Sequence, residues 1–312
     1  MTFDQPFNLM GGKWNLAPLI VSRFPPHHCF LEVFGGSLAV LLNKQPSPVE
    51  VVSDIDSNIV NFFLQLRDNP EALRYKVENT PYAREVYEGW LHRWRRGKWR
   101  PEDPLERAAV WFVLQQMSMS GKFGSGWSYS NIRNSSQSFY SKLNSFEAIA
   151  HRLRKVQIEN LDFEEFILKW DDEWVLSYHD PPYLVEGRDT AYEYYAGKKF
   201  TIDDHRRLAR LLSNIKGKAI VSYYPHPLVD ELYPKEKWFR EEIPVIKTSA
   251  YEPGVKDKPV GVELLLYNFE PLPLDRLLAQ VQRGVCPNCQ LPIEPQIKGC
   301  WRCPGCGWSS CE

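Results

Sequence analysis

An apolar stretch that stops at two consecutive prolines constrains this chain more than any other feature. Residues 174–178 (WVLSY) are apolar enough for a buried strand, and the run Asp180, Pro181, Pro182, Tyr183 comes just after them. Proline has no backbone N–H and ends a strand. In α/β folds the carboxyl ends of parallel strands are where ligands bind. The sequence therefore predicts a buried strand whose tip carries Asp180 into a binding site.

The four residues of this run suit the binding of an exocyclic amine. The Asp180 carboxylate and the Pro181 carbonyl are two acceptors with no competing donor, because Pro182 has no N–H. Together they can hold both hydrogens of an amino group, and the Tyr183 ring offers a flat face to a base. Four residues alone leave another interpretation open, in which the strand ends in an ordinary proline turn with a capping aspartate.

A second strand pattern lies near the N-terminus and predicts a nucleoside site. Residues 28–34 (HCFLEVF) are followed by a glycine turn at 35–37 and a helical pattern at 38–42, and residues 49–53 form the next apolar segment. Glu32 can take an amino or cationic group. Asp54 comes about twenty positions after the glycine turn, where a ribose offers its hydroxyls. The three-glycine dinucleotide pattern is missing, which disfavours NAD and leaves an adenosyl ligand open.

Taken together, these segments resemble the Dam-type family of S-adenosylmethionine-dependent DNA adenine N6-methyltransferases over about residues 7–270. The matching segments, in family order, are Gly11-Gly12-Lys13, the glycine motif at 32–42, Asp54-Ile55-Asp56, Asn160 to Phe163, and the catalytic motif Asp180 to Tyr183. The chain has Ser37 or Leu38 where the family's glycine motif often carries another glycine.

The resemblance implies a Rossmann-like class I methyltransferase sheet of α/β class with a helical target-recognition insert. We assign residues 1–64 and 156–275 to the catalytic domain, 65–155 to the insert and 276–312 to a zinc ribbon. The implied catalytic residues are Asp180, Pro181, Pro182 and Tyr183. Contacts to S-adenosylmethionine are implied for Leu9, Gly12, Lys13, Glu32, Val33, Phe34, Gly35, Asp54, Ile55, Asp162, Phe163 and Asp180.

The predicted insert concentrates positive charge, although the formal net charge of the whole chain is only −1. Its basic cluster consists of Arg93, Arg95, Arg96, Lys98 and Arg100, interleaved with Trp90, Trp94 and Trp99. Cationic and aromatic groups together favour phosphates and bases. The alternative is a solvated helix face whose tryptophans pack on the core.

A glycine-rich aromatic loop at residues 121–130 resembles the family segment that inserts into DNA beside an extruded base. Its candidate DNA contacts are Lys122, Phe123, Trp127 and Tyr129. We expect this loop to be flexible, which suits induced fit. The alternative is a surface loop without a role in binding.

The segments after the catalytic motif carry structural signals only. Thr201 and Asp204 predict a helix N-cap, and an apolar strand at 219–222 follows that helix. Residues 261–268 (GVELLLYN) are similar to the family's last strand. His205 is expected to pack rather than act as a base. We assign no chemistry to these segments.

Two CxxC pairs near the C-terminus predict a structural zinc site. Cys286 and Cys289 form the first pair and Cys303 and Cys306 the second, with thirteen residues between them. Four thiolates at this spacing suit a tetrahedral ion, and a segment of about thirty residues lacks an adequate core of its own. A redox pair is the weaker alternative. The ribbon is expected to contact DNA, a protein partner or only its own zinc.

Composition is compatible with the globular enzyme that the resemblance implies, whose implied partner is double-stranded DNA. The 312 residues are 43% hydrophobic, enough for a substantial α/β core. No long apolar run or signal-like start occurs, so we expect a cytoplasmic protein without membrane insertion, compatible with a monomer. The alternatives are a cytosine-N4 or protein-amide methyltransferase, or a non-catalytic DNA-binding protein with the same fold.

Overall fold

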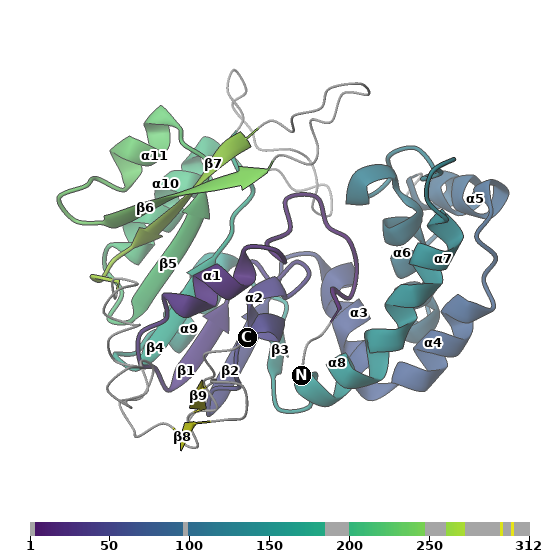
Figure 1. Cartoon of the computed structure of the whole chain (residues 1–312), viewed down its shortest axis with the longest axis horizontal. Coiled ribbons are helices and arrows are strands. Elements are labelled where there is room, and N and C mark those ends of the chain that lie inside the picture. The colour runs from purple at the N-terminus through teal and green to yellow at the C-terminus, as the bar shows by residue number, and fades with distance from the viewer. Residues whose placement is uncertain are drawn as a thin grey trace.

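The computed structural model describes residues 4–95, 99–184, 200–246 and 260–271, and the backbone of 294–295 and 301–302. Its main feature is a seven-stranded sheet with the order β3-β2-β1-β4-β5-β7-β6 (Figure 1). The strands are β1 (Cys29–Glu32), β2 (Val49–Ser53), β3 (Gln157–Glu159), β4 (Val175–His179), β5 (Lys218–Tyr223), β6 (Phe239–Ile246) and β7 (Val260–Tyr267). Two short strands, β8 (Glu294–Pro295) and β9 (Trp301–Arg302), pair with each other.

Helices cover both faces of the sheet and form a separate group beside it (Figure 1). Those in the catalytic part are α1 (Ala17–Ser22), α2 (Ala39–Asn43), α3 (Ser57–Asp68), α9 (Phe163–Trp170), α10 (Ile202–Leu212) and α11 (Pro227–Leu232). Those in the predicted insert are α4 (Pro70–Glu78), α5 (Arg84–Arg95), α6 (Pro104–Met117), η1 (Met119–Gly121), α7 (Ser135–Ser141), η2 (Lys142–Ser145) and α8 (Phe146–Leu153).

The pairing of the strands confirms the predicted Rossmann-like sheet. Strands β3, β2, β1, β4 and β5 are parallel, in the order 3-2-1-4-5 that is typical of doubly wound folds, and β7 is antiparallel to both β5 and β6. The order reverses between β1 and β4, where Glu32 is the register partner of Tyr178. A ligand crevice is expected at the carboxyl ends of these two strands.

Alternating side chains bury both faces of the sheet. Phe30, Leu176 and Ile220 belong to one apolar cluster, whereas their neighbours Leu31 and Val221 belong to the other. Successive side chains of a strand point to opposite faces, and a sheet with helices on both sides needs apolar residues at both sets of positions. This explains why the strands are nearly continuous apolar runs.

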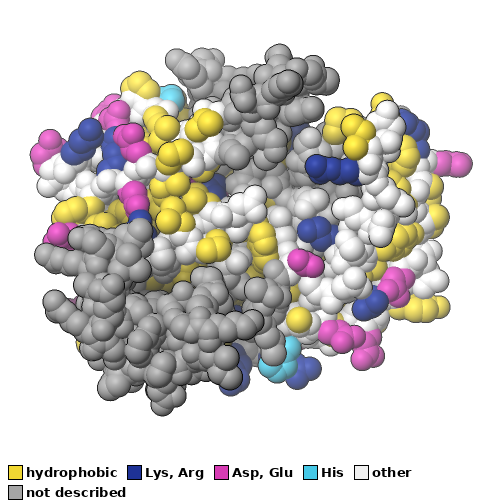
Figure 2. All heavy atoms as spheres, viewed as in Figure 1, with side chains coloured by type: hydrophobic (Ala, Val, Ile, Leu, Met, Phe, Trp, Pro, Cys, Tyr) yellow, Lys and Arg dark blue, Asp and Glu magenta, His cyan; other side chains and the backbone are white. Residues whose placement is uncertain are grey.

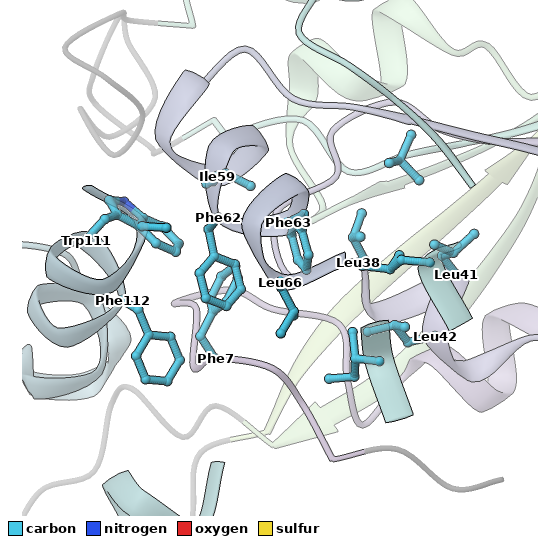
Figure 3. Close-up of a cluster of buried hydrophobic side chains, with 14 of the residues drawn as sticks. Phe7, Leu38, Leu41, Leu42, Ile59, Phe62, Phe63, Leu66, Trp111 and Phe112 are labelled. Carbon is cyan, nitrogen blue, oxygen red and sulfur yellow. The ribbon is translucent and has the colours of Figure 1, made fainter. Parts of the chain in front are cut away.

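The first of these clusters continues from the sheet into the insert through α3. Figure 3 shows Phe62 of α3 facing Trp111 and Phe112 of α6, with the Phe62 and Phe112 rings stacked at 5.5 Å. Phe63 and Leu66, on the same helix, lie toward the α2 side chains. The insert therefore packs on the sheet side through one shared hydrophobic core.

The elements predicted from sequence match the structure closely. Residues 49–53 form β2 and Thr201 closes a capping box with Asp204 on α10. The first strand ends at Glu32, earlier than the apolar run to Phe34, because the chain turns there into the glycine segment. Among the described helices, none combines the length and apolar character that a membrane span requires.

Candidate active site

A cleft opens at the carboxyl ends of β1, β2 and β4, where the strand order reverses. Its empty volume, which includes space open to solvent, is about 760 Å³. The residues that line it are Val33, Phe34, Asp54, Ile55, Leu161, Asp162, Phe163, Asp180, Pro182, Phe200, Asp204 and Arg207.

Most of the residues predicted for the cofactor converge on this cleft. Seven of them line it: Val33, Phe34, Asp54, Ile55, Asp162, Phe163 and Asp180. Leu9, Gly12, Lys13, Glu32 and Gly35 are not on its lining. Sequence reasoning missed Phe200, Asp204 and Arg207, and it treated Asp204 only as part of a helix cap. Leu161 lies in the matching segment 160–163 but was not among the implied cofactor contacts. Asp204 and Arg207 are one turn apart on α10, and this spacing could have indicated that both lie on the same charged face of the helix.

Asp54 joins the glycine turn to the start of α3. Its carboxylate accepts hydrogen bonds from the backbone N–H of Gly36 and of Asp56, both at 2.8 Å. Burial raises the pKa of Asp54 to about 7. Gly36 has a φ of +48°, and a Cβ there would lie 2.9 Å from the Leu9 side chain. Leu9 thus supports the glycine turn from behind.

Glu32 holds a helix terminus. It is buried, and its two oxygens accept from the backbone N–H of Val40 at 3.2 Å and of Leu41 at 2.7 Å. Those bonds satisfy donors of the first turn of α2, which otherwise have no intrahelical partner. Burial raises the pKa of Glu32 to about 8. Glu32 therefore has a structural role at the start of α2, whereas the sequence suggested only that it binds an amino or cationic group of a ligand.

Three phenylalanine rings form an aromatic wall of the cleft. Phe34, Phe163 and Phe200 lie with their ring centroids 5.7–5.8 Å apart. Beside them Asp162 caps α9 and is held by Arg207, whose guanidinium donates to both carboxylate oxygens at 3.0 and 3.1 Å. A wall of this kind suits a flat ring with an amino group at its edge.

Asp180, which also lines the cleft, belongs to a buried ionic group. Its Oδ1 lies 2.9 Å from Nζ of Lys13, which also lies 3.6 Å from Oε1 of Glu263. The Lys13 side chain is 8% exposed and that of Glu263 4%, against 20% for Asp180. Although burial lowers it, the pKa of Lys13 is raised overall by Asp180 and Glu263, so Lys13 stays an ammonium.

Tyr183 is fixed by the same group and by two further rings. Its hydroxyl donates to Glu263, and Nζ of Lys13 lies 4.6 Å above its ring centroid. The Tyr183 ring packs against Tyr224 edge-to-face at 4.6 Å and against Tyr223 at 5.7 Å. The structure thus brings together Lys13, which the resemblance implied as a cofactor contact, and the catalytic candidates Asp180 and Tyr183, and it adds Glu263.

Sequence reasoning placed Glu263 on the last strand and gave it no function. The available signal was a single carboxylate inside an otherwise apolar run at 260–267. Glutamate is rarely fully buried without a partner, so an acidic residue in a buried strand indicates a site. Burial raises the pKa of Glu263 to about 7.

The described residues of the basic cluster are engaged within the protein. Arg95 donates to the Gly124 carbonyl, and Arg100 stacks over Trp94 at 3.8 Å. Trp94 is buried, which agrees with the alternative in which the tryptophans pack on the core. Arg93 is exposed and lies 4.0 Å over the ring of Trp99. Arg96 and Lys98 lie outside the described residues.

No single basic surface stands out on the face shown in Figure 2. The described Lys and Arg side chains are spread over the sheet side and the helical side, with Asp and Glu among them. Any DNA contact on this face therefore depends on individual residues rather than on one broad patch.

Hydrogen bonds from neighbouring side chains hold the backbone of the glycine-rich loop. The Ser118 hydroxyl accepts from Gly124 N–H at 2.9 Å, and the Gly121 carbonyl accepts from the Gln115 side chain at 2.8 Å. These bonds give no support to the expected flexibility. Phe123 packs on Trp94, whereas Trp127 and Tyr129 stack on each other at 6.0 Å.

Exposure separates the aromatic residues of the loop. Tyr129 is 65% exposed, whereas Phe123 and Trp127 are partly buried and packed against the core. Arg84 lies over the rings of both Trp127 and Tyr129. Of the predicted loop contacts, Tyr129 is the aromatic side chain most available to a partner.

The four predicted zinc ligands, Cys286, Cys289, Cys303 and Cys306, lie outside the described residues. Within the described ranges no group of three or more His, Cys, Asp and Glu side chains could hold a metal. His205, expected to pack, is buried with Nδ1 at 2.8 Å from the Tyr223 hydroxyl, and burial lowers its pKa to about 4.

The sequence profile of the D12 class of N6 adenine-specific DNA methyltransferases matches residues 10–247. This chain belongs to that family. The match spans the glycine turn, the insert and the Asp180 motif. It bears out the resemblance to DNA adenine N6-methyltransferases that these segments indicated.

Individual relatives of this family cover most of the chain at low identity. The type II methyltransferase M1.LlaDCHI of Lactococcus lactis subsp. cremoris is 26% identical over 239 residues, 72% of this chain and 82% of that protein. The DNA adenine methylase of Haemophilus influenzae is 23% identical over 75% of this chain and 84% of its own length. The DNA adenine methylase of Escherichia coli K12 is 24% identical over 82% and 92%.

Proposed function

We propose that this protein transfers a methyl group from S-adenosylmethionine to N6 of a specific adenine in double-stranded DNA, with Asp180 as the residue that holds the amine. The observation that carries this proposal is the position of Asp180. Its carboxylate lines the cleft from the tip of β4, followed by two prolines that add no competing donor at Pro182. The family assignment agrees with this chemistry.

The residues that line the cleft suit the cofactor in their chemistry. The aromatic wall of Phe34, Phe163 and Phe200 would hold the adenine ring, with Asp162 at its amino edge. Asp54 and Ile55 line the same cleft and would face the ribose. When bound, S-adenosylmethionine supplies a sulfonium methyl group as the electrophile.

The target adenine must leave the duplex to reach Asp180, as bases do in DNA methyltransferases. We assign its two N6 hydrogens to the Asp180 carboxylate and the Pro181 carbonyl, and its ring face to Tyr183. Adenine N6 is weakly nucleophilic in the ground state. Acceptors fixed beforehand favour the positive charge that develops on nitrogen, and alignment with the methyl group supplies the rest.

We assign DNA contacts to the helical insert at 65–155. The residues proposed for this role are Arg93, Arg95, Arg96, Lys98, Arg100, Lys122, Phe123, Trp127 and Tyr129. Of these, the exposed members are Arg93, Arg95, Arg100, Lys122 and Tyr129. Arg95 donates to the Gly124 carbonyl and Arg100 to the Trp94 carbonyl, so Arg93 and Tyr129 are the members that we test first. We assign residues 1–64 and 156–275 to the catalytic domain and propose that the protein acts on DNA in the cytoplasm. A monomer contains every residue that we assign to the site.

We further propose that residues 276–312 bind one structural zinc through Cys286, Cys289, Cys303 and Cys306. The antiparallel pairing of Glu294 with Arg302 supports this assignment, since it folds the segment between the two CxxC pairs back on itself. Metal analysis should give about one zinc per chain, and replacing Cys286 and Cys289 by Ser should remove it. A zinc content unchanged by this double replacement would contradict the assignment.

Expression in a host that lacks adenine methylation tests the function. Single-molecule sequencing of that host's DNA should find N6-methyladenine within one short shared sequence, and none with Asp180→Ala. Methylcytosine instead would favour the cytosine-N4 alternative. Unmodified DNA despite cofactor-binding protein would favour the non-catalytic one.

A further inference from the structure

The second carboxylate beside Lys13 has no place in the reaction described so far. Glu263 lies on β7, which joins the sheet next to β5, and its side chain is 4% exposed. It accepts a hydrogen bond from Tyr183 and lies 3.6 Å from the Lys13 ammonium. A buried carboxylate held by two residues of the methyl-transfer site requires an explanation.

The group contains one positively charged side chain and two carboxylates. Lys13 is a buried cation between Asp180 at 2.9 Å and Glu263 at 3.6 Å, so one ammonium is shared by two carboxylates. Removing one partner of a buried ion pair is costly because the other charge stays buried alone. Lys13 therefore needs an ionised neighbour at every stage of the reaction.

In the proposed reaction one of the two carboxylates next to Lys13, that of Asp180, loses its negative charge. As the N6 lone pair forms its bond to the methyl carbon, the sulfonium S–C bond breaks and its electron pair stays on sulfur. N6 then carries a positive charge and must release a proton. The nearest base in the proposed pose is the Asp180 carboxylate that holds the amine. Once protonated, Asp180 no longer balances the charge of Lys13.

We propose that Glu263 is a positioning residue of the methyl-transfer site, which becomes the counter-ion of Lys13 when Asp180 takes the proton from N6. The inference rests on the function proposed above. The group changes from one ammonium and two carboxylates to one ammonium, one carboxylate and one carboxylic acid. Lys13 keeps an ionised partner throughout, and Asp180 becomes a usable base.

Glu263 must be ionised to act in this way, which gives the proposal a pH signature. The groups that face it are Lys13, Asp180, Tyr183, Tyr178 and Tyr224. Burial raises the pKa of Glu263 to about 7. Below that pH it is neutral and cannot balance Lys13. The rate of methyl transfer should therefore rise with pH through about 7.

Glu263→Gln tests this in a single turnover with DNA and cofactor saturating. We expect the rate to fall at least ~10-fold and the acid limb near pH 7 to vanish, with little change in the affinity for either substrate. Glu241→Gln is a matched control. Glu241 lies on neighbouring β6 and likewise holds a tyrosine hydroxyl, of Tyr267, and a cation, Arg23. It should keep the wild-type rate and acid limb.

A double-mutant cycle covers the case in which Glu263→Gln alone does not fold. Lys13→Met combined with Glu263→Gln removes one charge of each sign, and should react at the rate of Lys13→Met alone. A further loss of rate in the double variant would show that Glu263 does not act through Lys13 and would overturn the proposal.

The outcomes also separate this inference from the proposed function. If wild-type enzyme forms N6-methyladenine and Glu263→Gln matches its rate and pH profile, the inference about Glu263 is overturned alone. If the wild-type enzyme forms no N6-methyladenine, both fail.

Discussion

The carboxyl edge of the sheet and the helical insert hold their charged residues in different ways. At the sheet edge Lys13, Asp180 and Glu263 are largely buried and pair with one another. In the insert Arg93 and Arg100 lie over tryptophan rings and remain in contact with solvent. Buried charges must be fixed in place to be tolerated, whereas exposed ones can rearrange around a partner. The first arrangement suits chemistry and the second suits binding.

The largest effect expected at the sheet edge, apart from loss of Asp180, is that of Tyr183→Ala. Losing the ring removes the face proposed for the extruded adenine and the hydrogen bond to Glu263. The single-turnover rate should fall by about 100-fold. Tyr183→Phe keeps the ring and should lose less. Equal losses for the two variants would mean that the hydroxyl, not stacking, is what matters.

Asp162→Asn tests the cofactor end of the same edge. Asparagine can still cap α9, so the helix should be preserved while the charge beside Arg207 is removed. Affinity for S-adenosylmethionine, measured by calorimetry, should weaken by about 10-fold. Unchanged affinity would take Asp162 out of the cofactor site.

The buried carboxyl groups at the sheet edge should make the stability of the protein depend on pH. Burial raises the pKa of Glu32 to about 8, and those of Asp54 and Glu263 to about 7. Each carboxyl group keeps its proton in the folded chain above the pH at which the unfolded chain loses it. Stability from these groups is therefore full below about pH 4 and is lost as pH rises through 7–8.

Buried histidines oppose this trend at lower pH. Burial lowers the pKa of His27, His179 and His205, so stability from them rises with pH up to about 6.5. Between about pH 6.5 and 7.5 the carboxyl effect dominates among the described groups, because this interval lies below the pKa of about 8 to which burial lowers Lys44. The free energy of unfolding should fall there by on the order of 1 kcal/mol. Urea titrations at both pH values measure this. A rise in stability over that interval would contradict the burial of the sheet-edge carboxylates.

The smallest effect is expected in the insert. Arg93→Gln should weaken DNA binding by about threefold and reduce the slope of log affinity against log salt by about one. Arg74→Gln is a matched control, because Arg74 is a helical arginine that pairs with Glu78 on its own helix. If Arg93→Gln leaves the slope unchanged, the basic cluster is a solvated helix face.

Sequence reasoning succeeded where position along the chain decides position in space. Residues that follow a parallel strand must meet at one edge of the sheet, so Val33, Asp54 and Asp180 converge as predicted. Thr201 and Asp204 likewise form their cap from local geometry alone.

The features that sequence reasoning missed depend on contacts between segments that are distant in the sequence. Glu263 reaches Lys13 only because β7 lies beside β5, and no local pattern shows that neighbour. Arg207 approaches Asp162 through the packing of α10 on α9. The loop at 121–130 has a flexible composition, yet Ser118 and Gln115 hold it from outside its own sequence. The glycine content of this loop therefore suggested mobility, whereas side chains of α6 and of its C-cap residue hold the loop backbone by hydrogen bonds.

The most direct test of the whole account compares Asp180→Ala with Tyr129→Ala on the same DNA, measuring affinity and single-turnover rate separately. Asp180→Ala should lower the rate by at least ~1000-fold and leave DNA affinity nearly unchanged, because it removes the acceptor for N6. Tyr129→Ala should weaken DNA affinity and keep the rate at saturating DNA. An Asp180→Ala rate within a few-fold of wild type would contradict the claim that methyl transfer takes place at this edge of the sheet.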